Sequence, residues 1–226
     1  MKKKRHALWI AVVTVLTMAC GNKQEQNLQT GKSDALTTEQ NVPGDSTVYG
    51  LACDGSSNTM LVFLPLTGGD PDTFNISAAS ERQQIFGQPA IGDKLAIMVN
   101  RTNPKVADMV IDLEQLKGEW CFTAEPREMG FEIKSEHIVR PIGISRDQSV
   151  APDSTIAEKR YRDWRIMNGQ LLLSETRRDT AGVVAITHTD TTQFVLLGPD
   201  TLVLRFGDGT EQGYYRRSEK LKVKSD

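Results

Sequence analysis

The sequence is poor in the residues that most often carry chemistry. Its 226 residues include three Cys and three His, and 6% are aromatic. Cysteines and histidines this few and this far apart do not provide the ligand spacing of a zinc site. The chain also lacks a Gly-x-Ser-x-Gly elbow, a His-Glu-x-x-His helix, a Cys-x-x-Cys pair and a phosphate-binding glycine loop. We therefore expect no metal, no cofactor and no catalytic residue, that is, a protein that is not an enzyme.

Two histidines stand near carboxylates without completing a catalytic arrangement. His137 follows Glu136, and His188 lies two residues before Asp190. Either pair can be written as a base with its orienting carboxylate, but no motif-bearing nucleophile accompanies it. We expect both histidines to lie at the surface in water. A hydrolase whose two carboxylates are brought together only by the fold stays open as the last alternative.

The chain has no excess of positive charge. It contains 27 Lys and Arg residues against 29 Asp and Glu residues, and four of the basic residues lie within the first five positions. Without these four, the net charge falls from −2 to −6. Nucleic-acid binding depends on the neutralisation of phosphates by Lys and Arg, so we expect no nucleic-acid partner.

The N-terminal segment is typical of a secretory leader. Lys2 to Arg5 form a basic region, and an apolar run of thirteen residues extends from Ala7 to Ala19. This run is too short to span the hydrocarbon core of a bilayer, which takes about 20 helical residues, but it fits the apolar region of a signal peptide. The run ends in Leu16-Thr17-Met18-Ala19-Cys20, which resembles a bacterial lipobox.

The lipobox resemblance implies that residues 1–19 are removed and that Cys20 carries the lipid anchor, palmitate included. Thr17 stands where a lipobox usually has Leu, and an ordinary secretory signal is the alternative. Residues 20–46 are polar and bury too little apolar surface to fold alone, so we expect a flexible tether. The resulting protein is a lipid-anchored lipoprotein of the bacterial cell envelope, at the outer membrane, facing either the periplasm or the outside.

Residues 47–115 predict a small β domain. Short apolar runs bounded by Gly, Pro, Asp and Asn are typical of strands, and five of them lie here with a helical segment, Ala78–Phe86, after the third. This order resembles the OB-fold, a five-stranded barrel. Because the region lacks a basic stripe with aromatic residues, the resemblance implies a glycan or protein contact surface, or a purely structural module.

Residues 116–219 predict a second barrel of about eight strands, followed by a basic tail at 220–226. Gly118-Glu119-Trp120 opens the region, and strand-like segments in hairpin order follow. Gly-x-Trp at the start of a strand resembles the first motif of the lipocalins, which are up-and-down barrels with an interior ligand site. The resemblance implies that Trp120 closes the base of the barrel and that Arg216 or Arg217, from the last strand, stacks on it. The alternative for Trp120 is a plain core aromatic.

Asn168-Gly169 between two apolar runs predicts a hairpin, because a type I′ turn needs positive φ at both central positions. A two-residue loop sets Met167 opposite Gln170, and this pairing continues residue by residue along both strands. Side chains alternate between the two faces of a strand. The register therefore places four apolar side chains on one inner face: Trp164, Ile166, Leu171 and Leu173.

Continuing this register outward predicts a charged rim, where Arg162 meets Glu175 and Arg160 meets Arg177. Two arginines at a barrel mouth attract a carboxylate or a phosphate. We therefore take Arg160, Arg162, Trp164, Glu175 and Arg177 as candidate ligand-binding residues. The alternative places Arg160 and Arg177 beyond the end of the barrel, in water.

The sequence thus predicts an all-β lipoprotein with two small barrels, OB-like and then lipocalin-like. We expect a binding module for a small amphiphilic or anionic ligand in the second barrel. The alternative is a non-catalytic structural or accessory envelope protein that acts through protein or glycan contacts, with a protein partner that the sequence does not identify. Cys53 and Cys121 fit either a disulfide or two separate buried thiols.

Overall fold

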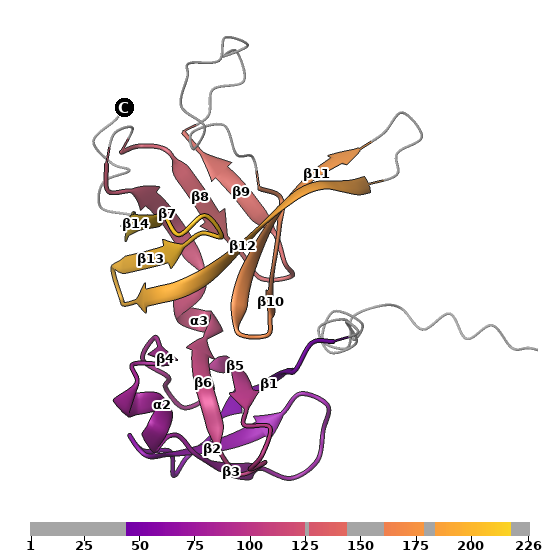
Figure 1. Ribbon diagram of the computed structural model, residues 1–226, viewed down its shortest axis with the longest axis vertical. Coiled ribbons are helices and arrows are strands. Elements are labelled where there is room, and N and C mark those ends of the chain that lie inside the picture. Colours follow the sequence, from indigo (N-terminus) through magenta and orange to yellow (C-terminus); the bar gives the residue numbers. More distant parts are fainter. Residues whose placement is uncertain (1–43, 125–126, 144–160, 179–183, 218–226) are drawn as a thin grey trace, which may run out of the picture. The chain divides into compact units, whose positions relative to one another are not determined.

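The computed structural model describes residues 44–124, 127–143, 161–178 and 184–217, and it is an all-β protein with two sheets (Figure 1). These residues belong to one compact unit of the chain, 33–226. The expected signal peptide, Cys20, the tether up to residue 43, Arg160 and the basic tail lie outside the described residues.

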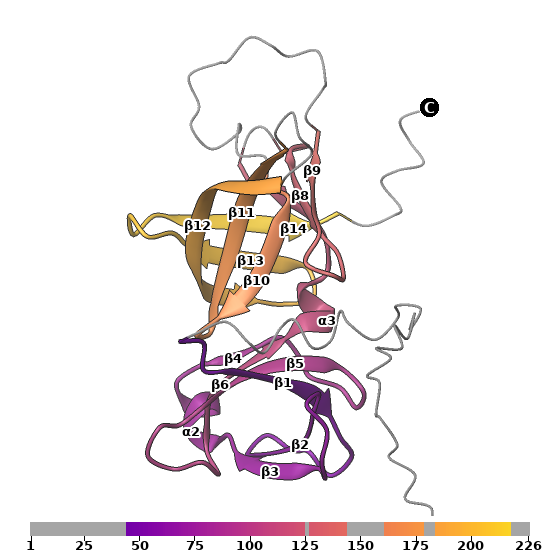
Figure 2. The same ribbon diagram turned by 90° about the vertical axis from the view of Figure 1, so that its right-hand side faces the viewer.

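The first sheet has six strands in the order β3–β2–β1–β5–β6–β4. All neighbours pair antiparallel except β4, which pairs parallel with β6. A short helix, α2 (Ser77–Glu81), follows the third strand, and Figure 2 shows it beside the sheet. The strands are β1 (Thr47–Ala52), β2 (Met60–Pro65), β3 (Asp72–Asn75), β4 (Ile85–Phe86), β5 (Lys94–Val99) and β6 (Ala107–Asp112).

A parallel bridge brings the two sides of this sheet together. It joins Asn75, at the end of β3, to Val106, just before β6, and the Asn75 amide donates to the Lys105 carbonyl at 2.8 Å. The five longer strands therefore form a partly closed barrel in the expected OB-like order. Its core alternates along the strands and includes Phe63 and Phe74, whose ring centroids lie 5.8 Å apart.

The expected helix over Ala78–Phe86 is too long, because the helix ends at Glu81. Gln83 has a φ of 56°, which an α-helix does not allow. The chain then enters β4, where Phe86 is buried. The apolar pair at 85–86 thus forms a sixth strand beside β6 instead of a last helical turn.

The second sheet is a nearly closed antiparallel barrel of eight strands in the order β10–β11–β12–β13–β14–β7–β8–β9. Neighbours in space follow one another in sequence, and the last strand pairs with the first, as in an up-and-down barrel. The strands are β7 (Gly118–Phe122), β8 (Gly130–Ile133), β9 (Val139–Ile142), β10 (Asp163–Met167), β11 (Gln170–Arg178), β12 (Val184–Leu197), β13 (Thr201–Arg205) and β14 (Glu211–Arg216).

The gap between β9 and β10 is bridged by only a few backbone contacts. Ile138 and Asp163 form an isolated antiparallel bridge. Next to it, the Trp164 amide donates to the His137 carbonyl at 2.9 Å, and the Val139 amide donates to the Arg162 carbonyl at 3.0 Å. These bonds join the two edges of the sheet and complete the ring of strands over a short length.

A one-turn helix, α3 (Leu113–Leu116), joins β6 to β7. Its first residue follows Asp112, whose side chain accepts a hydrogen bond from the Gln115 amide at 2.9 Å and so caps the helix. Asp112 is 2% exposed, and this burial raises the pKa of its carboxyl group, against the opposing effect of the Gln115 bond. The chain therefore crosses from one sheet to the other through a capped helical turn.

One of the two hydrophobic clusters contains residues of both sheets, and the other lies within the six-stranded sheet. Phe86 of β4 packs against Phe194 of β12, with ring centroids 5.3 Å apart. The Tyr49 hydroxyl donates to the Ile166 carbonyl at 2.6 Å, and the Gly87 amide donates to a carbonyl of β12 at 3.0 Å. The regions expected as two separate barrels are thus packed against each other through apolar and polar contacts.

Candidate functional site

Trp120 and Arg216 close the end of the barrel that lies next to α3. Trp120 is fully buried, and its indole N–H donates to the Leu116 carbonyl at 2.8 Å. The guanidinium carbon of Arg216 lies 4.2 Å from the centroid of the Trp120 ring, within the range of a cation–π contact. The stacking implied by the Gly-x-Trp resemblance is therefore present, and Arg216 rather than Arg217 provides it.

The guanidinium of Arg216 is also bound by backbone carbonyls. Its nitrogens donate to the carbonyls of Lys117 at 2.7 Å, Pro199 at 2.5 Å and Gln115. Burial lowers the pKa of the Arg216 guanidinium. Gly118 has a φ of 133°, and a Cβ there would collide with Arg216, so the motif needs glycine at this position.

The predicted hairpin register of β10 and β11 is confirmed. Met167 pairs with Gln170 and Trp164 pairs with Leu173. Asn168 and Gly169 have φ values of 51° and 73°, as a type I′ turn requires. The four side chains predicted on the inner face are all at most 5% exposed: Trp164, Ile166, Leu171 and Leu173.

The predicted rim differs from the structure at Arg162. Arg162 is exposed, whereas the preceding residue, Tyr161, is 5% exposed and packs inside the barrel. The reason is an irregular backbone: the register ends at Asp163, and the Arg162 amide donates to the Ser174 carbonyl at 2.8 Å. This irregularity breaks the two-residue alternation on which the prediction depended.

The side chains of the two other arginines of the predicted rim lie outside the described part of the structure. Arg160 lies outside the described residues, and Arg177 is described only by its backbone, which pairs with Ala185. Glu175 is half-buried and lies opposite His188 of β12. Of the candidate ligand-binding residues with described side chains, Trp164 is buried, Glu175 is half-buried and Arg162 is exposed.

A largely buried carboxylate, that of Asp190, lies in the barrel beside Tyr161. Asp190 of β12 is opposite Leu173, and its side chain is 15% exposed. It accepts hydrogen bonds from the Tyr161 hydroxyl at 2.5 Å and from the His188 imidazole at 3.2 Å. Burial, followed by the bond to Asp190, raises the pKa of Tyr161 far above its usual range. The described rim therefore has an acidic group where the sequence predicted basic ones.

A cleft of about 550 Å³ opens on the six-stranded sheet. It lies where α2 ends, where β5 ends and along the start of β6. Its lining comprises Arg82 and Gln84 after the helix, residues 98–102 at the end of β5, Asp108 and Met109 of β6, and two residues at the border with the barrel, Ser46 and Asn168.

The loop between β5 and β6 is held by the side chain of Asn100. The Asn100 carbonyl oxygen accepts from the Thr102 amide at 2.9 Å, the Thr102 hydroxyl at 2.7 Å and the Asn103 amide at 2.9 Å. The Asn100 amide nitrogen donates to the Asp108 carboxylate at 2.9 Å. A loop fixed in this way loses little conformational entropy when a ligand binds.

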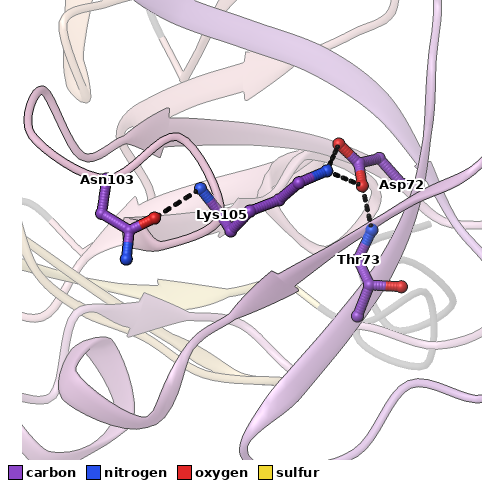
Figure 3. Close-up of polar contacts among 4 residues, drawn as sticks. All are labelled: Asp72, Thr73, Asn103 and Lys105. Carbon is purple, nitrogen blue, oxygen red and sulfur yellow. Dashed lines mark hydrogen bonds and ion pairs between the residues drawn. The ribbon is translucent and has the colours of Figure 1, made fainter.

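The other end of this loop is tied to β3 (Figure 3). The Asn103 side chain accepts from the Lys105 amide at 3.0 Å, and the Lys105 ammonium bonds both carboxylate oxygens of Asp72, at 2.6 and 2.8 Å. The Lys105 bond, with help from the Thr73 amide, lowers the pKa of Asp72. Both ends of the loop that carries Arg101 are thus fixed.

Two guanidinium groups give the cleft a local positive charge. Within the described part of the chain, neither Arg82 nor Arg101 forms an ion pair, and the one carboxylate in the lining, Asp108, is bonded to Asn100. Two positive charges therefore meet one negative charge, in a chain whose net charge is −2. Guanidinium groups bind carboxylate and phosphate oxygens through paired N–H donors, so the cleft suits an anionic group.

The cleft borders the contact between the two sheets. The Asn168 side-chain oxygen accepts from the Ser46 amide at 3.0 Å and from its hydroxyl at 2.8 Å. A Cβ on Gly169 would lie 2.7 Å from the Met109 sulfur and 3.1 Å from Met98. The hairpin tip thus packs closely on two methionines, which add apolar surface beside the arginines.

A second cleft, of about 430 Å³, lies near the β8–β9 turn. Both lysines in its lining form ion pairs: Lys134 bonds Glu132 at 3.2 Å, and Lys117 bonds Glu114. Because these charges are already neutralised, this cleft is a weaker candidate than the one beside Arg82 and Arg101.

The described residues contain no group of three His, Cys, Asp or Glu side chains that could hold a metal ion. None of their helices is long and apolar enough to cross a membrane. Cys53 and Cys121 are both free thiols, so no disulfide joins them. Burial raises the pKa of the Cys121 thiol.

None of the residues that line the larger cleft was a candidate in the sequence. The available signal was the run from Asn100 to Pro104, which predicts a turn because of its Asn and Pro residues. What the sequence does not show is that Arg82 lies near this turn. That proximity depends on the position of the segment after α2 beside β6, which is a long-range contact.

The fold and the cleft define an all-β protein with a nearly closed eight-stranded barrel, a six-stranded sheet and a basic cleft on that sheet. Comparison of the chain with protein-family models, with curated proteins and with solved structures finds no match.

Proposed function

We propose that this chain is a lipid-anchored binding protein of the bacterial cell envelope and that its ligand site is the cleft beside Arg82 and Arg101. One observation carries the proposal: two arginines without ion-pair partners among the described residues line a cleft whose loop is already fixed by Asn100. The ligand class is an anionic group, carboxylate or phosphate, attached to a small apolar part that contacts Met98 and Met109.

We place the ligand site in the cleft and not in the barrel interior, where the sequence predicted it. The described interior is occupied by large side chains, of which Trp120, Leu202 and Leu204 are fully buried. The carboxylate of Asp190, which lies in the barrel beside Tyr161, would repel an anionic headgroup. The barrel is better suited to support the six-stranded sheet, against which it packs.

The envelope location is supported by the leader alone. Lys2 to Arg5, the apolar run and the lipobox-like segment before Cys20 have the composition of a lipoprotein signal. Two or more acyl chains anchor a protein stably, since each buried CH₂ contributes about 0.8 kcal/mol. Labelling of cells with an alkyne-tagged palmitate should mark the wild-type chain and leave Cys20→Ala unmarked; equal labelling of both would contradict the anchor.

The ligand site is tested by calorimetric titration of residues 44–226 with three probes below their micelle concentrations: inorganic phosphate, n-octyl phosphate and n-octyl glucoside. We expect octyl phosphate to bind more tightly than inorganic phosphate, because its chain contacts the methionines, and octyl glucoside not to bind. Arg101→Gln and Arg82→Gln should each weaken octyl phosphate binding about tenfold, since a charge-assisted hydrogen bond contributes about 1.5–3 kcal/mol.

The matched control is Arg140→Gln, which removes an exposed arginine of β9 outside the cleft. It should bind octyl phosphate like the wild type. Equal weakening by all three substitutions would reduce the effect to net charge and contradict the site. Vesicles of phosphatidylglycerol provide a further arm: binding to vesicles but not to octyl phosphate identifies a lipid surface as the source of the phosphate. The absence of binding to every probe would favour the accessory protein that acts through protein contacts.

A further inference from the structure

The chain enters the described fold at the rim of the cleft beside Arg82 and Arg101. Ser46 and Asn168 both line this cleft, and their contact joins the N-terminal segment to the tip of the β10–β11 hairpin. The Ser46 amide and hydroxyl donate to the Asn168 side-chain oxygen at 3.0 and 2.8 Å. The segment that leads back toward Cys20 therefore leaves the fold next to the proposed ligand site.

Three further hydrogen bonds hold the entering segment in place. The Asn168 backbone amide donates to the Asp45 carboxylate at 2.9 Å, and the Asn168 side-chain amide donates to the Gly44 carbonyl at 3.1 Å. The Asp45 carboxylate also accepts from the Thr47 amide at 2.9 Å. Because residues 44–47 are fastened to the hairpin, a chain held by a lipid before Gly44 holds the body at the rim of the cleft.

The proposed lipid anchor is a limited length of chain away from this rim. Residues 20–43 separate the expected lipidated Cys20 from Gly44, and even a fully extended chain of this length spans at most about 80 Å. A site joined to a membrane by such a chain meets the lipid headgroups at an effective concentration on the order of millimolar. A headgroup that binds the cleft with only millimolar affinity would therefore occupy it in the anchored protein.

We infer that the cleft binds the phosphate of an anionic phospholipid in the membrane that holds the anchor, so that the protein is attached to this membrane at two points. The inference rests on the proposed function and names the ligand of the same cleft. The guanidinium groups of Arg82 and Arg101 donate to the phosphate oxygens. The glycerol and the first methylene groups of the lipid contact Met98 and Met109, which line the cleft beside the arginines.

The distribution of charge favours the cleft as the side that meets an anionic membrane. Without the four basic residues of the leader the chain has a net charge of −6, so an anionic surface repels the body on average. At the cleft, Arg82 and Arg101 are exposed. Two carboxylates near them are bonded within the fold, Asp45 to backbone amides and Asp108 to the Asn100 side chain. Each arginine that reaches an anionic leaflet strengthens the attachment about fivefold.

The test measures how fast phenylglyoxal modifies each arginine of the lipidated chain, read by peptide mass spectrometry. The chain is held by its anchor on vesicles of phosphatidylcholine alone or of phosphatidylcholine with added phosphatidylglycerol. Arg82 and Arg101 should react about fivefold more slowly on the vesicles with phosphatidylglycerol, because a bound phosphate covers their nitrogens. In Arg101→Gln, Arg82 should lose most of this protection, since a single guanidinium holds the phosphate more weakly.

The control within the same molecule is Arg140, an exposed arginine of β9 outside the cleft, which should react at the same rate on both kinds of vesicle. Equal slowing of Arg140 and the two cleft arginines would overturn the inference, because it would reflect a general attraction to the membrane. Unprotected cleft arginines on the vesicles, with both protected by n-octyl phosphate in residues 44–226, would overturn the lipid ligand and keep the proposed cleft. Protection by neither would contradict both.

Discussion

The eight-stranded barrel and the six-stranded sheet use their arginines differently. In the barrel, Arg216 stacks on Trp120 and donates to backbone carbonyls. In the six-stranded sheet, Arg82 and Arg101 line an open cleft and have no ion-pair partner among the described residues. An arginine whose nitrogens donate to backbone carbonyls supports the structure, whereas an arginine beside a preformed cleft has donors left for a ligand.

The two sheets also differ in how they close. The barrel is sealed at one end by a fully buried indole. The six-stranded sheet meets along one side at the bridge between Asn75 and Val106 and at the short strand β4. The cleft opens beside this loosely joined side.

The largest effect is expected at the closed end of the barrel. Trp120→Ala removes a fully buried indole, its hydrogen bond to Leu116 and the surface on which Arg216 stacks. We expect a loss of about 3–5 kcal/mol in the free energy of unfolding, measured by urea denaturation. Arg217→Ala, in the half-buried neighbour of Arg216, should cost less than 1 kcal/mol (roughly the range of surface substitutions). Similar losses in both variants would mean that Trp120 does not close the barrel.

An intermediate effect is expected where the two sheets touch. Gly169→Ala places a Cβ 2.7 Å from the Met109 sulfur at a residue with a φ of 73°. We expect it to cost about 1–3 kcal/mol, from backbone strain and overpacking. The control, Gly207→Ala, adds a Cβ that meets nothing within 4 Å and should be nearly neutral. A Gly169→Ala variant as stable as the control would contradict the close packing of the hairpin tip on the sheet.

The smallest effect is expected at the exposed pair of Lys105 and Asp72. The pKa of Asp72 is lowered in the folded state, so the pair stabilises the fold above the ordinary Asp pKa. This contribution is lost as the pH falls below about 4, when the carboxylate takes up a proton. Lys105→Ala should therefore lower stability slightly at pH 7 and leave it unchanged near pH 2. An equal loss at both pH values would show that the pair contributes through packing and not through charge.

Local patterns predicted most of the strands and the hairpin. Asn168-Gly169 set the register of β10 and β11, because that turn admits one pairing, and Gly118-Glu119-Trp120 marked the start of the barrel. The prediction failed at Arg162, where an irregular backbone reverses the alternation and puts Tyr161 inside. Strict alternation holds only while the ladder is regular.

The cleft could not be predicted, because its residues come from segments that are distant in sequence. Arg82 follows α2, Arg101 lies between β5 and β6, and Asn168 belongs to the barrel. Each of these residues alone looks like an ordinary surface or turn residue. Their grouping depends on strand order and on the packing of one sheet against the other, which single-sequence patterns do not encode.

The central claim is that the six-stranded sheet binds the anionic ligand and the barrel supports it. The most direct measurement is the map of backbone amide shifts as n-octyl phosphate is added to residues 44–226. The account predicts shifts at residues 82–84 and 98–103, and unchanged amides at Leu171 and Leu173 inside the barrel. Shifts along β10 and β11 with an unchanged 98–103 loop would contradict it and return the ligand site to the barrel.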